Sequence, residues 1–194
     1  MEDYYLVNRV SNSYLSIIEG MMLNRPPIDL SEIFEMGSQF HYSILEPHKL
    51  NHDYKDIDKV YKMRDSALKD PLLNLIVKQS KAIEFEKEYY PIIDDVEAKM
   101  KLDGVLNHDL GLELKSTSCK TEKSFMAAID HFSIDRQCAW YIDGAKLARI
   151  FIFAVSKENP HHTFKYVVTK GDSMYHSGKE KYKKLLMYYK NIIR

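Results

Sequence analysis

Residues 98–117 restrict how this chain can fold more than any other stretch, because two strand-like runs flank a polar turn centred near His108. An antiparallel hairpin about that centre places Asp103 opposite Glu113. Cross-strand neighbours have Cβ atoms about 5 Å apart, so two carboxylates held there repel each other. Lys115 shares a strand face with Glu113, since residues two apart point the same way. The pattern therefore predicts two carboxylates and one ammonium group converging on one spot, with a cation between the carboxylates.

The same stretch also allows a simpler interpretation, in which an exposed hairpin carries an ordinary Glu–Lys pair. Charged and apolar residues commonly alternate on a strand that has one face in water. Leu112 and Leu114 point away from Glu113 and can enter the core. The hairpin alone leaves both interpretations open.

Length and charge limit the class of protein. The chain has 194 residues, which suits one domain with a sizeable core, and we expect 1–194 to form a single domain. Lys plus Arg and Asp plus Glu number 28 each, so the formal net charge is zero. A protein that coats nucleic acid is usually strongly basic, so action on DNA would require a local patch or channel.

The compartment is expected to be the cytoplasm. Two cysteines, Cys119 and Cys138, indicate no disulfide framework, which favours a reducing environment. The acidic N-terminus lacks the features of a signal peptide. No apolar run approaches the ~20 residues needed to span a bilayer, so we expect no membrane contact.

Residues 1–80 are expected to be mostly helical, and the helix that ends at Leu45 is the most informative of them. Gly37 and His41 lie one turn apart on the same side of this helix. Glycine costs about 1 kcal/mol inside a helix, so its presence indicates close packing or close approach of a ligand. His41 could supply a nitrogen to a metal, or it could be a core histidine that bonds to the backbone.

Residues 81–194 are expected to form a sheet core with flanking helices. A strand over 81–90 would carry Glu84, Glu86 and Glu88 on one face. The continuously apolar run 149–155 is typical of a strand that is buried on both faces. The expected fold class is therefore α/β (α+β), with a central mixed β-sheet flanked by helices.

Two of the expected helices in this half carry candidate binding residues. Gln137 and Tyr141 are four apart on a helix over about 133–144, where they could bind a phosphate or a base, or lie on a half-exposed surface. Ser133 can cap that helix. The last helix, about 173–193, has a lysine-rich face that is either solvated or follows DNA phosphates: Lys179, Lys181, Lys183, Lys184 and Lys190.

Together these residues resemble the PD-(D/E)xK nuclease superfamily, specifically its RecB-like exonuclease branch, and within that branch the exonuclease VIII (RecE)-type domains of phages and prophages. The likeness spans nearly the whole chain. Its segments follow the family's order: Ser11-Asn-Ser-Tyr-Leu15, Gly37-Ser-Gln-Phe-His41 with Leu45-Glu-Pro47, Glu86, Asp103, Glu113-Leu-Lys115-Ser-Thr117, and Arg136-Gln137-Cys-Ala-Trp-Tyr141-Ile-Asp-Gly144. The turn between Glu86 and Asp103 is shorter than in the family, so Glu84 and Glu86 both stay open as the acidic site residue.

The resemblance implies a restriction-endonuclease-like core with an N-terminal helical region, and a site that binds Mg²⁺ or Mn²⁺. Lys115 would orient the attacking water, and Gln137 and Tyr141 would position the scissile strand. The implied metal ligands are His41, Glu86, Asp103, Glu113 and the carbonyl of Leu114.

The resemblance also implies a metal-dependent DNA exonuclease that digests linear duplex from an end in phage-type recombination. Such a protein would supply single strands to an annealing recombinase and would form a homo-oligomeric ring. The alternatives are an endonuclease of the restriction or junction-resolving type, a non-cleaving nucleic-acid-binding protein on the same fold, and a structural α/β protein without a nucleic-acid role.

Overall fold

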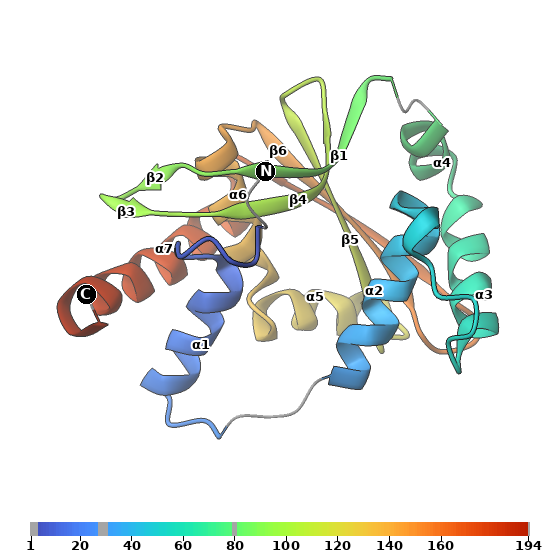
Figure 1. Ribbon diagram of the computed structural model, residues 1–194, viewed down its shortest axis with the longest axis horizontal. Coiled ribbons are helices and arrows are strands. Elements are labelled where there is room, and N and C mark those ends of the chain that lie inside the picture. The colour runs from blue at the N-terminus through green and yellow to red at the C-terminus, as the bar shows by residue number, and fades with distance from the viewer. Residues whose placement is uncertain (1–3, 27–30, 79–80, 194) are drawn as a thin grey trace.

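A five-stranded mixed sheet forms the centre of the protein in a computed structural model, which describes residues 4–26, 31–78 and 81–193 (Figure 1). The strand order is β1-β4-β5-β6-β7, with β5 and β6 parallel and every other pair antiparallel. A separate small ribbon pairs β2 (Ile92–Ile93) with β3 (Val96–Glu97). The sheet strands are β1 (Ile83–Tyr89), β4 (Met100–Leu106), β5 (Leu110–Thr117), β6 (Arg149–Ser156) and β7 (Thr163–Thr169).

Helices cover both faces of this sheet (Figure 1), which confirms the expected α/β class. On one side lie α2 (Ser31–Leu45), α3 (Ile57–Leu68) and α4 (Pro71–Lys78). On the other lie α1 (Asn12–Met22), α5 (Glu122–His131), α6 (Ile134–Ala145) and α7 (Ser173–Tyr188). Two short turns complete the helical elements, a 3₁₀ turn η1 (Pro47–Lys49) and a π-type turn η2 (Tyr189–Ile193). In the described residues, no helix is both long and apolar enough to cross a membrane.

The two sides of the sheet have separate apolar cores, and the period-two pattern of β5 decides which residue enters which core. Leu112 and Leu114 pack with Phe40 of α2 and Phe153 of β6. Trp140 of α6 belongs to the opposite core and is fully buried. Strand β6 is buried along almost its whole length, as its apolar run predicted.

The β4–β5 hairpin has the register that the sequence predicted. Val105 pairs with Gly111, and Gly104 pairs with Leu112, so the hairpin is centred on His108. Pairing of the two strands ends at Gly104 and Leu112. Beyond that point β4 continues along β1, whereas β5 continues along β6, and Figure 1 shows β5 leaving the direction of β4. An opening therefore forms at the next residues of each strand.

Helix α6 is held from two sides. The guanidinium of Arg136 is 1% exposed and contacts α1, where it bonds to Glu19 at 2.9 Å and to the Ser16 hydroxyl at 2.6 Å. On the other side Gly178 of α7 passes so close that a Cβ there would lie 2.1 Å from the Asp135 carbonyl oxygen. Only glycine fits at that crossing, so α6 and α7 approach each other unusually closely.

Two local predictions need correction. Ser133 precedes α6 as its N-cap residue, but its φ is 52° and its side chain makes no capping hydrogen bond. On α7 the predicted lysine-rich face is partly neutralised, because Lys179 pairs with Asp143 at 2.9 Å and Lys181 pairs with Asp135 at 2.8 Å.

Candidate active site

The site begins where β4 and β5 separate. Asp103 follows the last paired residue of β4, and its Oδ2 accepts a hydrogen bond from the backbone N–H of Leu114 at 2.6 Å. This bond joins the two strands after their backbone pairing has ended. Continuing the register by one residue places Asp103 beside Glu113, as the sequence predicted.

Three potential metal ligands meet at this opening from three different elements. His41 of α2, Glu86 of β1 and Asp103 of β4 each place one ligand atom within 4.8 Å of the others. The ring Nε2 of His41 lies 2.9 Å from the carbonyl oxygen of Leu114. A carbonyl can only accept, so Nε2 carries the proton in the neutral ring and the Nδ1 lone pair faces Asp103, whose Oδ1 is 3.5 Å away.

The pKa values of His41 and Asp103 are shifted in opposite directions, and each shift favours the charged form. Burial lowers the pKa of His41, but the neighbouring Asp103 carboxylate outweighs burial and the pKa is raised overall. Burial likewise opposes ionisation of Asp103, yet His41 and Lys115 hold its pKa below the usual value. Asp103 therefore stays an anion and can act as a hard oxygen ligand.

The structure brings Glu86, and not Glu84, to His41 and Asp103. Glu86 has a φ of 51°, so the predicted alternation of Glu84, Glu86 and Glu88 is interrupted at its middle residue. A left-handed backbone at a non-glycine residue costs about 1 kcal/mol or more and often accompanies a functional position. Burial raises the pKa of Glu86, and Lys101 pairs with it at 2.9 Å. Glu84 instead lies outside, against Lys87 and near His108.

Glu113 lies next to this triad and has a different set of partners. Its side chain is buried, and Oε1 accepts hydrogen bonds from Lys115 Nζ at 2.5 Å and from Gln137 Nε2 at 2.7 Å. Oε2 has no hydrogen-bond partner in the part of the chain that the structure describes. Burial, and then repulsion by Asp103, raise the pKa of Glu113 to about 7. Gln137 also donates to the hydroxyl of Tyr141 at 3.0 Å.

These residues fit a divalent cation. A buried carboxylate oxygen without a donor is costly, and a bound cation would satisfy it. Carboxylate oxygens with one imidazole suit Mg²⁺ or Mn²⁺. The predicted site residues His41, Glu86, Asp103, Glu113, Leu114, Lys115, Gln137 and Tyr141 all lie within this one network of contacts. The Leu114 carbonyl already accepts from His41, which leaves one lone pair free.

Lys101, which pairs with Glu86, also belongs to the site and was not among the predicted residues. Lys101 and Asp103 stand two apart on β4 and share a face, as Glu113 and Lys115 do on β5. That repeated acid–lysine spacing is the signal that could have found it. The structure also shows how much space surrounds Gly37. Among the described residues, an added Cβ would meet only the Ser116 hydroxyl, at an ordinary 3.6 Å. Close packing against the residues that the structure describes therefore does not explain this glycine.

Comparison with known proteins found similar solved structures but no match in sequence. No protein-family model matches the chain, and no curated protein matches it in sequence. Among solved structures, a protein of Eubacterium rectale described as "Putative exonuclease" is similar at a TM-score of 0.58 and 13% identity, over 86% of this chain and 71% of that one. The two proteins therefore share a fold, in which a central mixed sheet is flanked by helices.

Two further solved structures are similar at lower TM-scores. The alkaline exonuclease LHK-Exo of Laribacter hongkongensis has a TM-score of 0.44 and 11% identity, over 92% of this chain and 78% of that one. The protein SSO0001 has a TM-score of 0.41 and 10% identity, over 90% of this chain and 84% of that one.

Proposed function

We propose that this protein is a Mg²⁺- or Mn²⁺-dependent deoxyribonuclease of the PD-(D/E)xK type, which digests linear duplex DNA from an end. The observation that supports this most is the joining of His41, Glu86 and Asp103 to the Glu113–Lys115 pair at one opening in the sheet. An ordinary hairpin has no reason to bury a carboxylate oxygen that has no hydrogen-bond donor among the described residues, as Oε2 of Glu113 is buried here. The fold shared with the Eubacterium rectale protein agrees with the proposal.

Hydrolysis of a phosphodiester requires a positioned water and stabilisation of negative charge, and the chain's residues suit both tasks. Asp103, Glu86 and His41 would hold the cation, with Glu113 completing the ligands. When bound, the cation would polarise the phosphoryl oxygen and lower the pKa of a water. Lys115 carries a raised pKa, so it stays an ammonium that can orient the water and offset developing charge.

Gln137 and Tyr141 would position the scissile strand. Both lie on one face of α6, and the Gln137 amide bridges Glu113 and the Tyr141 hydroxyl. Burial keeps the pKa of Tyr141 well above its ordinary value, so its hydroxyl stays neutral and can donate to a phosphate oxygen. Both Nε2 hydrogens of Gln137 are used in these two bonds, so Gln137 would act by holding the Tyr141 hydroxyl beside Lys115, and that hydroxyl would orient one phosphate against the water.

The proposal also includes an oligomeric state and a partner protein. A ring of identical chains that feeds single strands to an annealing recombinase would explain how a neutral chain holds DNA, because basic faces could line a shared channel. Gel filtration with light scattering tests the ring directly. A monomeric mass at micromolar concentration would contradict the oligomer and leave the chemistry open to the next test.

The decisive experiment uses end-labelled linear duplex and closed circular duplex of the same sequence, each with Mg²⁺ or with EDTA. We expect progressive loss of the linear substrate with Mg²⁺ alone, and no loss with Lys115→Ala. Cleavage of the closed circle would support an endonuclease instead. Equal binding in EDTA without any cleavage would support a non-cleaving nucleic-acid-binding protein.

A further inference from the structure

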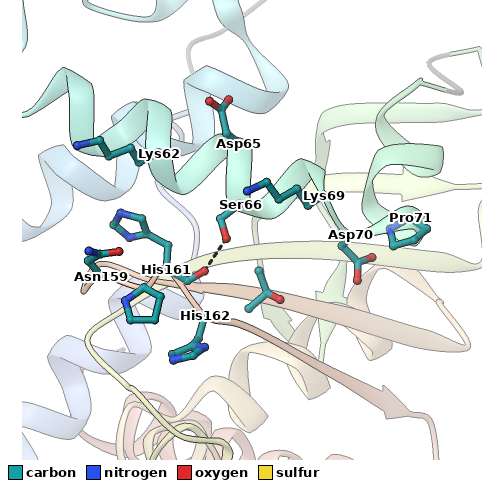
Figure 2. Close-up of a pocket in the computed structure, with 11 residues that line it drawn as sticks. Lys62, Asp65, Ser66, Lys69, Asp70, Pro71, Asn159, His161 and His162 are labelled. Carbon is teal, nitrogen blue, oxygen red and sulfur yellow. Dashed lines mark hydrogen bonds between the residues drawn. The ribbon is translucent and has the colours of Figure 1, made fainter.

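A cavity lies away from the Asp103 site, between α3, the start of α4 and the turn that joins β6 to β7 (Figure 2). Its volume is about 760 Å³, and residues 159–163 form the wall opposite α3. Ser66 of α3 donates a hydrogen bond from Oγ to the carbonyl oxygen of His161 at 2.6 Å, which fixes the turn against the helix. We call this cavity, with its α3 and turn walls, the α3 groove.

The α3 groove has more positive charge than its acids can balance. Lys62, Ser66 and Lys69 follow one face of α3 at i, i+4 and i+7, above the His161–His162 turn in Figure 2. Both lysines are exposed, and within the described ranges neither ammonium has a carboxylate within ion-pair distance.

The acids that line the groove are already paired. Asp70 accepts from Lys165 at 2.7 Å and from the backbone N–H groups of the first turn of α4. Asp65 accepts from the guanidinium of its neighbour Arg64 at 2.8 Å. The charges of Lys62 and Lys69 therefore remain uncompensated within the groove.

Two more lysines lie near each other on the two elements that form the walls of the groove, α3 and the β6–β7 turn. Burial and the nearby ammonium of Lys59 lower the pKa of Lys157, so two like charges are held close together there. Lys59 stands one turn before Lys62 on α3, and Lys157 belongs to the β6–β7 turn. Cations gathered without partners destabilise a fold unless an anion binds them.

The β6–β7 turn, which forms one wall of the groove, is joined to the strand that carries Glu113 and Lys115. The backbone N–H of Lys157 in that turn donates to the carbonyl of Thr117 at 2.6 Å, and Thr117 stands two residues beyond Lys115 on β5. Helix α3 also packs on α2, which carries His41.

We propose that the α3 groove binds backbone phosphates of the DNA substrate whose scissile phosphodiester lies at the Asp103 site. The inference rests on the proposed function and names a second contact for the same substrate. It also explains how a chain with zero net charge engages a polyanion, because Lys179 and Lys181 of α7 are tied to acids whereas Lys62 and Lys69 are free to pair with phosphates. The occupant is a sugar–phosphate backbone, read without base specificity.

The test compares two charge-matched double variants. Lys62→Gln with Lys69→Gln removes the groove lysines, and Lys183→Gln with Lys184→Gln removes two exposed lysines of α7. Binding of a fluorescein-labelled duplex with a short single-stranded end is measured by anisotropy in EDTA, over a series of salt concentrations. We expect the groove variant to bind on the order of tenfold more weakly, with a log–log salt slope smaller by about 2, and the α7 variant to match the wild type.

Cleavage of the same duplex with Mg²⁺ separates this inference from the proposed function. A wild-type protein that cleaves, together with a groove variant whose affinity and salt slope are unchanged, would overturn the α3 groove as a DNA site. A wild-type protein that binds through the groove lysines but never cleaves would keep the inference and reject the nuclease. Absence of both binding and cleavage would reject both.

Discussion

Gln137 of α6 donates a hydrogen bond to Glu113 Oε1 of β5 at 2.7 Å, and Lys115 Nζ bonds to that same oxygen. One carboxylate oxygen therefore joins a helix to the sheet and holds an ammonium group in place. The other oxygen of Glu113 is buried without a partner in the described residues. This division assigns one oxygen to holding the site together and leaves the other for a cation.

Lys115→Ala is expected to remove cleavage while the fold and DNA binding persist. In the proposed mechanism the ammonium group supplies positive charge where negative charge develops, and loss of one such group typically costs about 10²–10³-fold in rate. Cleavage rates, a melting curve and anisotropy in EDTA test this together. A folded Lys115→Ala variant with wild-type cleavage would refute the assignment.

Glu86→Gln and Glu84→Gln form a matched pair that tests which acid serves the site. The structure places Glu86 with His41 and Asp103, and Glu84 outside against Lys87. We expect calorimetry to show Mn²⁺ affinity falling about 10- to 100-fold in Glu86→Gln, by analogy with other losses at metal shells, and unchanged affinity in Glu84→Gln. Equal effects of the two substitutions would contradict the placement.

Glu113→Gln should change how stability depends on pH in EDTA. The folded pKa of about 7 exceeds the ordinary 4.5, so the native state binds more protons between these values and stability falls as pH rises through that window. The free energy of unfolding of the wild type should therefore fall between pH 5 and pH 8. The variant lacks this titration, so its fall over the same range should be smaller by on the order of 2 kcal/mol. Urea unfolding at both pH values measures the difference, and parallel profiles would contradict it.

Asp103→Asn should lower the stability of the metal-free protein at neutral pH. Simple repulsion between Asp103 and Glu113 would predict stabilisation on removing either charge, but the lowered pKa of Asp103 shows that its neighbours favour the anion. The N–H of Leu114 would also lose a charged acceptor. Without metal we expect a lower melting temperature above pH 5, and a loss that shrinks as pH falls toward 3. A more stable variant at pH 7 would show that repulsion dominates.

Gly37→Ala and Gly178→Ala test two glycines that serve different purposes. At Gly178 a Cβ would clash with the Asp135 backbone, so we expect destabilisation of about 1–3 kcal/mol. At Gly37 the contact is ordinary, so alanine should stabilise the helix by up to about 1 kcal/mol and yet slow cleavage if substrate approaches there. Denaturant unfolding and cleavage rates separate the two. Unaltered cleavage by Gly37→Ala would show that nothing approaches that face.

Local sequence patterns were sufficient for most of the fold. The hairpin register followed from symmetry about His108, and the buried strand β6 followed from its unbroken apolar run. These features depend on short-range periodicity, which a single sequence displays directly. The same holds for the helix that aligns Gln137 with Tyr141.

Long-range charge pairing could not be predicted in the same way. The choice of Glu86 over Glu84 depends on a left-handed backbone at one residue, which alternation in the sequence hides. The lysines of α7 looked free because their acids, Asp130, Asp135 and Asp143, stand more than thirty residues away in the chain. The unpaired lysines of α3 gave no signal, since the turn that faces them comes ninety residues later.

The buried guanidinium of Arg136 connects the first helix to the helix that carries Gln137. Arg136 precedes Gln137, and its only charged neighbour on α1 is Glu19, at 2.9 Å. An unpaired cation in that interior would cost about 3–5 kcal/mol, which α6 could avoid only by turning the arginine outward. Such a rotation would carry Gln137 away from Glu113, so displacing α1 should also break the hydrogen bond that holds the candidate site to α6.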